Sequence, residues 1–123
     1  MKKRAVLIVG HGSKLKGFQT SMEQLARRRK KDKRFPMVLC AYLEITPPSI
    51  LEAICRCVQK GANEIMILPY FLLMGNHVKS DIPHLVSLAR KKYRLQAKIV
   101  LCPYLGYHEN ILEVVKERLR QAL

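Results

Sequence analysis

The sequence predicts an α/β fold in which one four-stranded parallel sheet carries helices on both faces. Four short apolar runs are rich in β-branched residues, and their hydrophobicity is continuous rather than alternating, as in strands buried on both faces. The segments between these runs space their apolar residues as amphipathic helices do. This alternation indicates a βαβαβαβα order and a single domain over residues 1–123.

Each expected element is marked by its own apolar residues. The strands are expected at residues 5–10, 37–43, 64–70 and 97–103. The helical spacing is carried by Phe18, Met22 and Leu25, then by Ile50, Ile54 and Val58, then by Val78, Ile82, Leu85 and Ala89, and finally by Leu112, Val115 and Leu119. We expect the strand order 2-1-3-4, which makes the first and third strands neighbours.

Helix-start and helix-stop residues bound the second helix. Thr46 followed by Pro47 is typical of an N-cap and a first helical position, and Gly61 is typical of the residue after a helix end. The sequence therefore predicts that the second helix begins at Pro47 and ends before Gly61.

A proline limits where the third helix can begin. Pro83 would break a helix interior, but it is tolerated in the first turn. A start near Ser80 or Asp81 meets this condition. That start leaves His77 in the loop before the helix.

The chain is strongly basic, and its charge has two interpretations. It contains 23 Lys and Arg against 9 Asp and Glu, a net charge of +14, which indicates either a polyanionic partner or a well-solvated surface. The run RRRKKDKR at residues 27–34 is interpreted as a solvated helix end or as a binding patch. A nucleic-acid-binding module is the rival function, but the chain has no nucleic-acid-binding motif and no aromatic residues within the basic run.

Cysteine usage and hydropathy indicate a soluble protein of the cytoplasm. Cys40, Cys55, Cys57 and Cys102 form no C-x-x-C pair, so we expect reduced thiols. The apolar run at residues 5–9 is shorter than that of a signal peptide and no small-residue cleavage site follows it. No segment approaches the length of a membrane span, and no membrane partner is expected.

Chemically active residues follow the ends of all four strands. His11, Glu44 and His77 follow the first, second and third strands, and Tyr104 and His108 follow the fourth. Ligands of open α/β sheets bind beside these carboxyl ends, near the point where strand order reverses, and His11 and His77 flank that point. Two imidazoles and one carboxylate suit a first-row divalent metal ion and leave coordination positions open.

Each of these residues also has a structural interpretation. A lone histidine at a strand end is more often a hydrogen-bonded structural group than a metal ligand. Glu44 could be a solvated loop acid, and Asp81 could cap the third helix. His84 is expected on the helix surface, and His108 could be a polar first-turn residue of the fourth helix.

Small residues around the two histidines predict tight turns. Gly10 and Gly12 permit close approach of a bulky ligand to the backbone, and Gly75 before Asn76 could do the same in the third loop. Ser13 lacks the G-x-S-x-G context of a nucleophile and is expected to cap the next helix or bind an anion. Neither G-x-x-x-x-G-K-[ST] nor G-x-G-x-x-G occurs, so no nucleotide is expected.

Four segments resemble one enzyme family in order. LIVGHGSK, AYLEITPPSILEAI, ILPYFLLMGNHVKSDIP and PYLGYHENILEVV are similar to segments of the class II tetrapyrrole chelatases, in their short, single-domain sirohydrochlorin cobaltochelatase form. The resemblance implies ATP-independent insertion of a divalent metal ion into sirohydrochlorin, with Co²⁺ expected for cobalamin biosynthesis. Ni²⁺ or Fe²⁺ are the alternatives, for coenzyme F430 or sirohaem.

The resemblance also implies roles for individual residues. His11 and His77 match the metal-binding, catalytic histidines of the family, and Glu44 matches the acid that assists them as a further catalytic and metal-binding group. Asp81, in the D-I-P motif, is expected to have a supporting role. Because longer relatives carry two such domains facing one cleft, a homodimer with facing sites is expected. The residues expected to bind the tetrapyrrole are Gly12, Ser13, Gly75, Asn76 and Tyr104.

Overall fold

Four parallel strands form the centre of the structure, a computed structural model that describes residues 2–29 and 32–123. The strands are β1 (Arg4–Gly10), β2 (Met37–Tyr42), β3 (Glu64–Pro69) and β4 (Lys98–Leu101). Their order in the sheet is β2-β1-β3-β4, which confirms the expected topology. Each strand ends within about two residues of its predicted end, as is usual for element boundaries.

The reversal of strand order lies between β1 and β3. Val6 of β1 is opposite Val38 of β2 on one side and Met66 of β3 on the other. The chain leaves β1 for β2, then returns across β1 to form β3. The loops after β1 and β3 therefore begin side by side at the carboxyl edge of the sheet.

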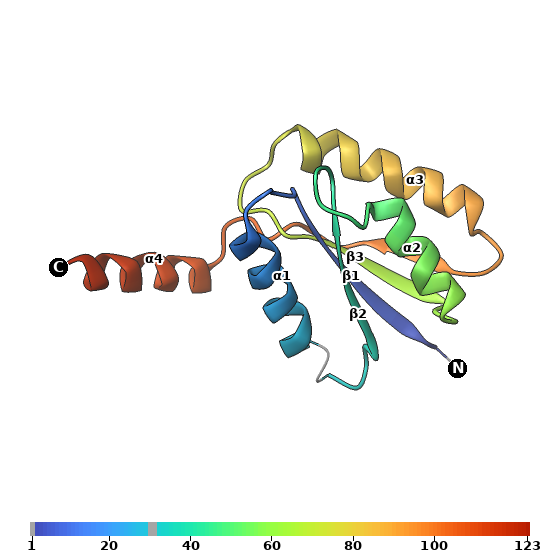
Figure 1. Cartoon of the computed structure of the whole chain (residues 1–123), viewed down its shortest axis with the longest axis horizontal. Helices are drawn as coiled ribbons and strands as arrows, with labels where there is room; N and C mark the ends of the chain where they lie inside the picture. The colour runs from blue at the N-terminus through green and yellow to red at the C-terminus, as the bar shows by residue number, and fades with distance from the viewer. Residues whose placement is uncertain (1, 30–31) are drawn as a thin grey trace.

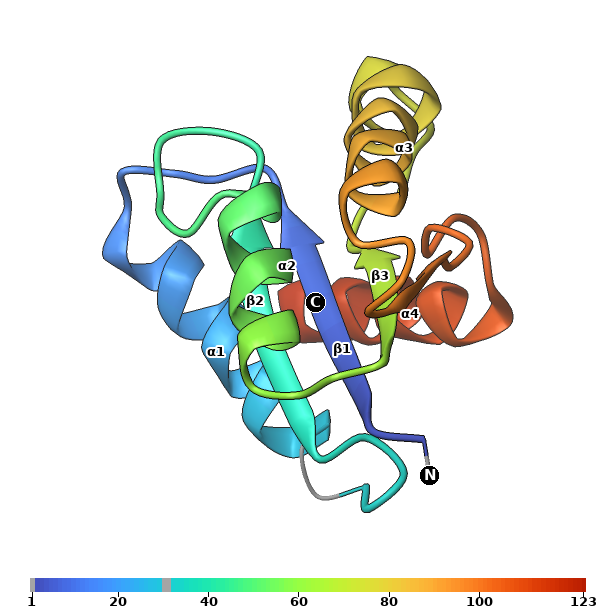
Figure 2. The ribbon, with the colours of Figure 1, turned by 90° about the vertical axis from the view of Figure 1, so that its right-hand side faces the viewer.

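Helices cover both faces of the sheet, as the sequence predicts. α1 (Lys16–Arg29) covers one face, whereas α2 (Ile50–Gln59) and α3 (Ile82–Lys92) cover the other (Figure 1, Figure 2). The larger core lies under α2 and α3, because alternate strand residues such as Leu7, Ile65 and Ile67 are fully buried there. Burial on both faces explains the continuous apolar runs of the strands.

The predicted start of α2 is wrong by three residues. Ser49 is the N-cap: its hydroxyl accepts a hydrogen bond from the Glu52 backbone, and the Glu52 carboxylate accepts one from the Ser49 backbone. This reciprocal pair satisfies two backbone donors, which Thr46 cannot do because its hydroxyl bonds to the backbone of Ser13. Gly61 follows the helix end with φ +91°, as predicted.

His77 lies in a helical turn, not in the loop where the sequence places it. A π-helical turn, His77–Asp81, runs directly into α3. Pro83 lies in the first turn of α3, which confirms that prediction. His77 is therefore held on a helix that packs beside the sheet, and single-turn π segments are frequent at functional sites.

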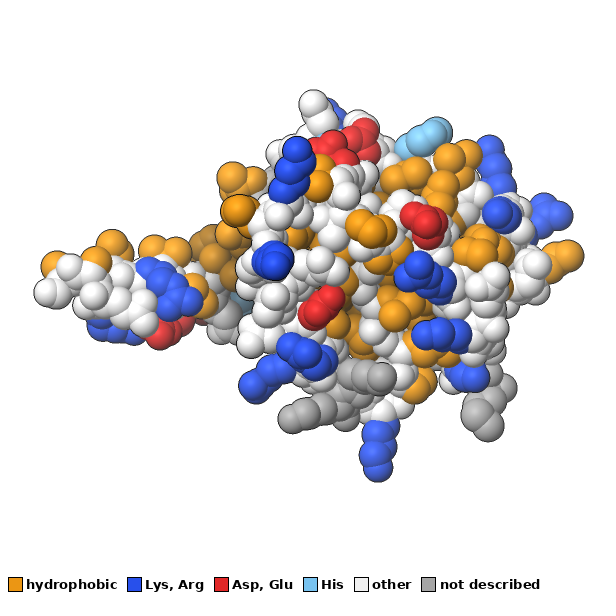
Figure 3. Space-filling model, in the orientation of Figure 1, with side chains coloured by type: hydrophobic (Ala, Val, Ile, Leu, Met, Phe, Trp, Pro, Cys, Tyr) orange, Lys and Arg blue, Asp and Glu red, His pale blue; other side chains and the backbone are white. Residues whose placement is uncertain are grey.

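The fourth helix, α4 (Glu109–Ala122), forms where its apolar spacing predicts but covers neither face of its own sheet. It projects from the body of the molecule on the side of α1 (Figure 1, Figure 3). None of the residues that the structure describes in α4 is buried. His108 is its N-cap, with Nδ1 accepting a hydrogen bond from the Asn110 backbone at 3.0 Å. The described part of the chain contains no helix with the length and hydropathy needed to cross a membrane.

Candidate functional site

Backbone hydrogen bonds bring the loops after β1 and β2 together. The Leu43 N–H donates to the Gly10 carbonyl at 3.1 Å, and the Glu44 N–H donates to the His11 carbonyl at 3.1 Å. Thr46 Oγ1 donates to the Ser13 carbonyl at 2.9 Å. These bonds continue the strand pairing beyond the sheet, so that His11 and Glu44 lie next to each other.

Glycine is needed at Gly12, and the space beside Gly10 at the end of β1 is also tight. Gly12 has φ +107°, and a Cβ there would overlap the carbonyl oxygen of Glu44. At Gly10 a Cβ would lie 2.9 Å from Cε of Met22, inside contact distance. A Cβ at Gly75 would have no described neighbour within 4 Å, so the protein leaves the space beside Gly75 open, and the close approach of a ligand there stays a prediction.

The two predicted histidines meet at this edge of the sheet. The ring centroids of His11 and His77 are 4.8 Å apart, with an angle of 63° between the planes. Each ring also contacts a carboxylate: His11 Nε2 lies 2.6 Å from Oε1 of Glu44, and His77 Nδ1 lies 2.8 Å from Oδ2 of Asp81. Both imidazoles are partly exposed, at 43% and 38% of the side chain, so solvent and ligands can reach them.

The carboxylates determine which ring nitrogens can bind a metal ion. A neutral imidazole has one N–H and one lone pair, and the N–H is held by the carboxylate that accepts it. The lone pairs then lie on Nδ1 of His11 and Nε2 of His77. Across residues 2–29 and 32–123, no three His, Cys, Asp or Glu side chains are arranged around one metal position. The three-ligand set with Glu44 therefore stays a prediction.

A large apolar cavity opens beside His11. It encloses about 1010 Å³ between α1 and the segment that follows β3. Leu15 and Leu73 on its wall are 74% and 83% exposed, which is unusual for leucine unless a ligand or partner covers it. The lining residues are Gly10, His11, Leu15, Gly17, Phe18, Ser21, Met22, Tyr70, Phe71, Leu72 and Leu73.

A smaller hollow lies on the α3 side of the histidine pair, and His84 is one of its lining residues. It encloses about 340 Å³, and His84 lines it together with Glu44, His77 and Asp81. His84 is exposed, as predicted, but it faces the site. The spacing of His77, Asp81 and His84, at i, i+4 and i+7, is the signal that places them on one helical face.

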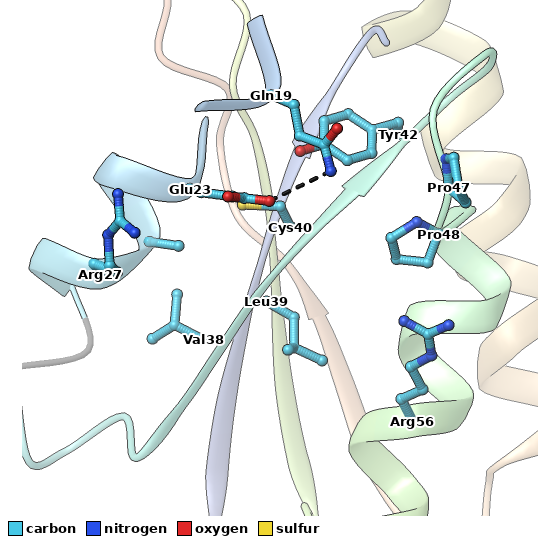
Figure 4. A pocket seen from close by; sticks show the side chains of 11 residues that line it. Gln19, Glu23, Arg27, Val38, Leu39, Cys40, Tyr42, Pro47, Pro48 and Arg56 are labelled. Atoms are coloured by element: carbon cyan, nitrogen blue, oxygen red, sulfur yellow. Dashed lines mark hydrogen bonds between the residues drawn. The ribbon is translucent and has the colours of Figure 1, made fainter. Parts of the chain in front are cut away.

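A third cavity lies at the edge strand, away from the histidines (Figure 4). It encloses about 360 Å³ between α1, β2 and α2, and Arg27 and Arg56 lie on its opposite sides. Burial, followed by the nearby Cys40, raises the pKa of Tyr42 to about 12, so its hydroxyl stays protonated at neutral pH. None of the residues predicted for the site lines this cavity.

The remaining predicted residues lie in the segments that follow β1, β3 and β4. Ser13 Oγ accepts a hydrogen bond from the Leu15 N–H at 3.1 Å, in the turn before α1. Asn76 precedes the π-helical turn, and its side chain makes no capping bond there. Tyr104 is half-buried in the loop after β4, against Gly106. In the described part of the chain, no hydrogen bond links Asn76 or Tyr104 to either imidazole.

Comparison with known proteins identifies similar chains along the whole length. The family described as CbiX matches residues 5–122. A sirohydrochlorin cobaltochelatase of Sulfolobus acidocaldarius is 34% identical over 118 residues, 96% of this chain and 91% of that protein. A chloroplastic sirohydrochlorin ferrochelatase of Arabidopsis thaliana is also 34% identical over 118 residues, but this chain spans 52% of its length.

Solved structures show the same relationship. The crystal structure of the sirohydrochlorin chelatase SirB from Bacillus subtilis subspecies spizizenii, in complex with cobalt, superimposes with a TM-score of 0.88 at 30% identity. The match covers 97% of this chain and 50% of that one. This chain therefore spans about half the length of the longer proteins it matches.

Proposed function

Because the chain belongs to the CbiX family, we propose that it inserts a divalent metal ion, Co²⁺ in the first instance, into sirohydrochlorin without ATP. The observation that carries this proposal is the pair of imidazoles, with ring centroids 4.8 Å apart, beside a large apolar cavity. Such a pair can hold an ion at one face of a flat macrocycle. The ATP-independent reaction agrees with a chain that carries no nucleotide-binding motif.

The geometry supports a stepwise exchange of ligands. Metal insertion requires that water leave the ion and that two pyrrole N–H protons be removed. Nδ1 of His11 and Nε2 of His77 supply lone pairs to the ion, which then passes to the pyrrole nitrogens. Glu44 and Asp81 fix the rings through their N–H groups and balance the positive charge of the ion. An imidazole released by the ion can accept a pyrrole proton, because its ordinary pKa is about 6.5.

The cavity and the charge of the chain suit the two parts of the substrate. The apolar wall formed by α1 and residues 70–73 offers a surface for the macrocycle. The acetate and propionate groups at the rim of sirohydrochlorin are attracted by a chain of net charge +14. Gly12, Ser13, Gly75, Asn76 and Tyr104 remain the proposed substrate-binding residues.

The names of relatives support cobalt and iron, and the nitrogen and oxygen donors keep nickel as a further alternative. The Sulfolobus relative is a cobaltochelatase, the Arabidopsis relative is a ferrochelatase, and SirB was solved with cobalt. Nitrogen and oxygen ligands accept all three ions, so metal supply contributes to the choice. Cobalamin biosynthesis is the proposed pathway for Co²⁺, sirohaem for Fe²⁺ and coenzyme F430 for Ni²⁺.

We also propose a homodimer of the cytoplasm. Longer relatives match this chain over about half of their length, and two copies of this chain facing each other would supply both halves of such a cleft. All four cysteines are free thiols, which is typical of a reducing compartment.

An anaerobic absorbance assay with sirohydrochlorin tests the proposal. Co²⁺, Ni²⁺ and Fe²⁺ are supplied in turn to the parent, to His11→Ala and to His77→Ala. Each substitution removes one ligand atom of the ion, so we expect the rate above the spontaneous reaction to fall by about 100-fold or more. His108→Asn is the matched control, because Asn keeps the N-cap of α4. Alanine variants that insert metal as fast as the parent contradict the proposal.

A further inference from the structure

The outer edge of β2 is a free edge of the sheet. β2 comes first in the strand order β2-β1-β3-β4, so β1 pairs with only one of its two sides. In a parallel ladder, the backbone N–H and C=O groups of successive residues point alternately to the two sides of a strand. The Leu43 N–H donates toward β1, and the Tyr42 N–H donates to Pro48 on the outer side. By this alternation, the backbone groups of Val38 and Cys40 also point outward.

The chain itself pairs with the carboxyl end of this edge. Ser49 forms a parallel bridge with Tyr42, and the Tyr42 N–H donates to the Pro48 carbonyl at 3.0 Å. After Ser49 the chain enters α2 and leaves the edge. The outer side of β2 thus accepts an extended backbone at Tyr42, whereas no described strand pairs with it at Val38 and Cys40.

A cavity gives access to this unpaired stretch. The cavity of about 360 Å³ at the edge strand is lined by Val38, Leu39 and Cys40 together with side chains of α1 and α2 (Figure 4). Val38 and Cys40 pack with the core under α1, and Leu39 packs with the core under α2. The cavity therefore extends across the strand edge from one face of the sheet to the other.

Two arginines flank this edge, one on each face of the sheet. Figure 4 shows Arg27 of α1 on one side of β2 and Arg56 of α2 on the other. Both side chains are exposed, and neither forms an ion pair or a hydrogen bond with the side chains that the structure describes. Glu23 is the one carboxylate among the described lining residues, and it accepts a hydrogen bond from Gln19 at 3.3 Å. The edge is therefore bordered by unpaired positive charge.

The same cavity is lined by a tyrosine whose buried hydroxyl lacks a partner. Tyr42 is 2% exposed, and its hydroxyl is the only buried side-chain nitrogen or oxygen in residues 2–29 and 32–123 without a hydrogen-bond partner. The thiol of the nearby Cys40 donates to the Met22 carbonyl at 3.4 Å. Because an unpaired buried hydroxyl is costly, this wall suits a ligand that is rich in oxygen acceptors.

We propose that the outer edge of β2 binds an extended acidic segment of a partner protein, which adds to the sheet as a further strand. The backbone of this segment pairs with the outward N–H and C=O groups of Val38 and Cys40. Side chains of a strand alternate between its two faces, so two neighbouring acidic residues lie one beside Arg27 and one beside Arg56.

Charge and backbone chemistry select this occupant. A second copy of the chain carries the same net charge of +14 and the same two arginines, so edge-to-edge pairing of two copies is disfavoured. A nucleic acid would neutralise the arginines, but it has no peptide groups to pair with a strand. None of the residues that line this cavity belongs to the histidine site, so the proposal is independent of the chelatase reaction.

Fluorescence anisotropy with labelled peptides gives the first test on the full chain. We expect the hexapeptide TVEEVT to bind, and its counterpart TVKKVT to bind at least about tenfold more weakly. Arg27→Glu/Arg56→Glu should lower the affinity for TVEEVT by at least about tenfold, because two attractive charges become repulsive. Lys91→Glu/Arg94→Glu makes the same change of net charge at exposed positions outside the cavity, and it should lower the affinity by less than about threefold.

Three results of the binding experiment overturn the proposal. The first is equal affinity for the acidic and the basic peptide. The second is an equal loss of affinity in the two double variants, which would show that only the overall charge matters. The third is binding of a labelled oligothymidylate with no binding of either peptide, which would assign the arginines to nucleic acid.

Amide hydrogen exchange, followed by NMR on the parent chain, tests the added strand without any substitution. Saturating TVEEVT should slow the exchange of the Val38 and Cys40 amides by at least about tenfold, because their N–H groups enter new hydrogen bonds. The Leu39 and Ala41 amides point to β1 with or without the peptide and serve as the internal control. A bound peptide that leaves exchange at Val38 and Cys40 unchanged contradicts the added strand, whatever the result of the chelatase assay.

Discussion

At the scale of single residues, the carboxylate beside each imidazole decides what the histidine pair can do. Glu44 and Asp81 each accept one ring N–H, so the two free lone pairs lie on different nitrogens of His11 and His77. The resemblance to chelatases assigns Glu44 to the metal, whereas its carboxylate is 2.6 Å from His11 in this structure. A carboxylate in that position can act through the imidazole without contacting the ion.

Gly12 provides a residue-scale prediction, because its conformation holds the loop that carries His11. Gly12→Ala adds a Cβ that overlaps the Glu44 carbonyl, on a backbone with φ +107°. Both effects destabilise the folded state, and we expect the free energy of unfolding to fall by about 2 kcal/mol or more. Urea denaturation measures this loss.

Gly75→Ala is the matched control for that substitution. A Cβ at Gly75 would meet open space, so the free energy of unfolding should change by less than about 0.5 kcal/mol. Equal losses in the two variants would show that the close approach of Gly12 to Glu44 is unimportant.

At the scale of helices and strands, local sequence patterns predicted which elements form more accurately than they predicted the residues where these elements begin and end. The apolar runs identify all four strands because a buried parallel strand must be apolar on both faces. Two N-cap patterns compete before α2, and Ser49 with Glu52 prevails over Thr46 with Pro47 because the capping box satisfies two donors. The S-x-x-E pattern was present in the sequence and could have decided the choice.

The location of α4 could not be read from its pattern. Periodicity predicts that residues 109–122 form an amphipathic helix, but it does not say which surface covers the apolar side. That outcome depends on the loop that Gly106 and His108 shape. The helical turn at His77 was missed because a proline in the first turn predicts a helix start near Asp81, whereas a π-helical turn precedes α3 in the structure.

The start of β3 provides a prediction at this scale. Arg4 donates to the buried Glu64 at 2.8 Å, and Lys2 lies 3.7 Å away; the Arg4 hydrogen bond, with these cations, lowers the pKa of the Glu64 carboxyl. A lowered folded-state pKa adds stability above the ordinary carboxyl range, and this stability is lost as pH falls through the folded-state value. Glu64→Gln should therefore lower the free energy of unfolding at pH 7, and the difference from the parent should shrink at pH 3.

Urea denaturation at the two pH values measures the effect of Glu64→Gln. Glu117→Gln on α4 is the control, because its carboxylate is exposed and only 3.9 Å from one arginine. If the free energies of unfolding of Glu64→Gln and the parent differ by the same amount at pH 3 and at pH 7, the lowered pKa assigned to Glu64 is contradicted.

At the scale of the whole molecule, the fold brings together residues that the sequence keeps apart. His11 and His77 are 66 positions apart, and the rule for open α/β sheets was enough to predict that they meet. It could not predict the ring contact, the pairing of His77 with Asp81 or the position of His84, because these depend on the helical turn after β3. The apolar cavity was not predicted from the sequence either, although the apolar run YFLLM after β3 contributes residues to its wall.

The molecule as a whole also looks like one side of a larger site. Its large cavity is lined from α1 and the segment after β3, and its wall includes the exposed Leu15 and Leu73. A second copy facing this wall would cover those leucines and exclude water from the macrocycle.

Crystallography with cobalt tests the central claim, that His11 and His77 together hold the ion that is passed to the ring. Crystals of the full chain soaked with Co²⁺ and measured at the cobalt absorption edge give an anomalous map that locates the ion. We predict a peak at about 2.1 Å from Nδ1 of His11 and from Nε2 of His77, the usual length of a bond between imidazole and a first-row metal ion. Cobalt bound elsewhere, with these two imidazoles free of it, would contradict the account.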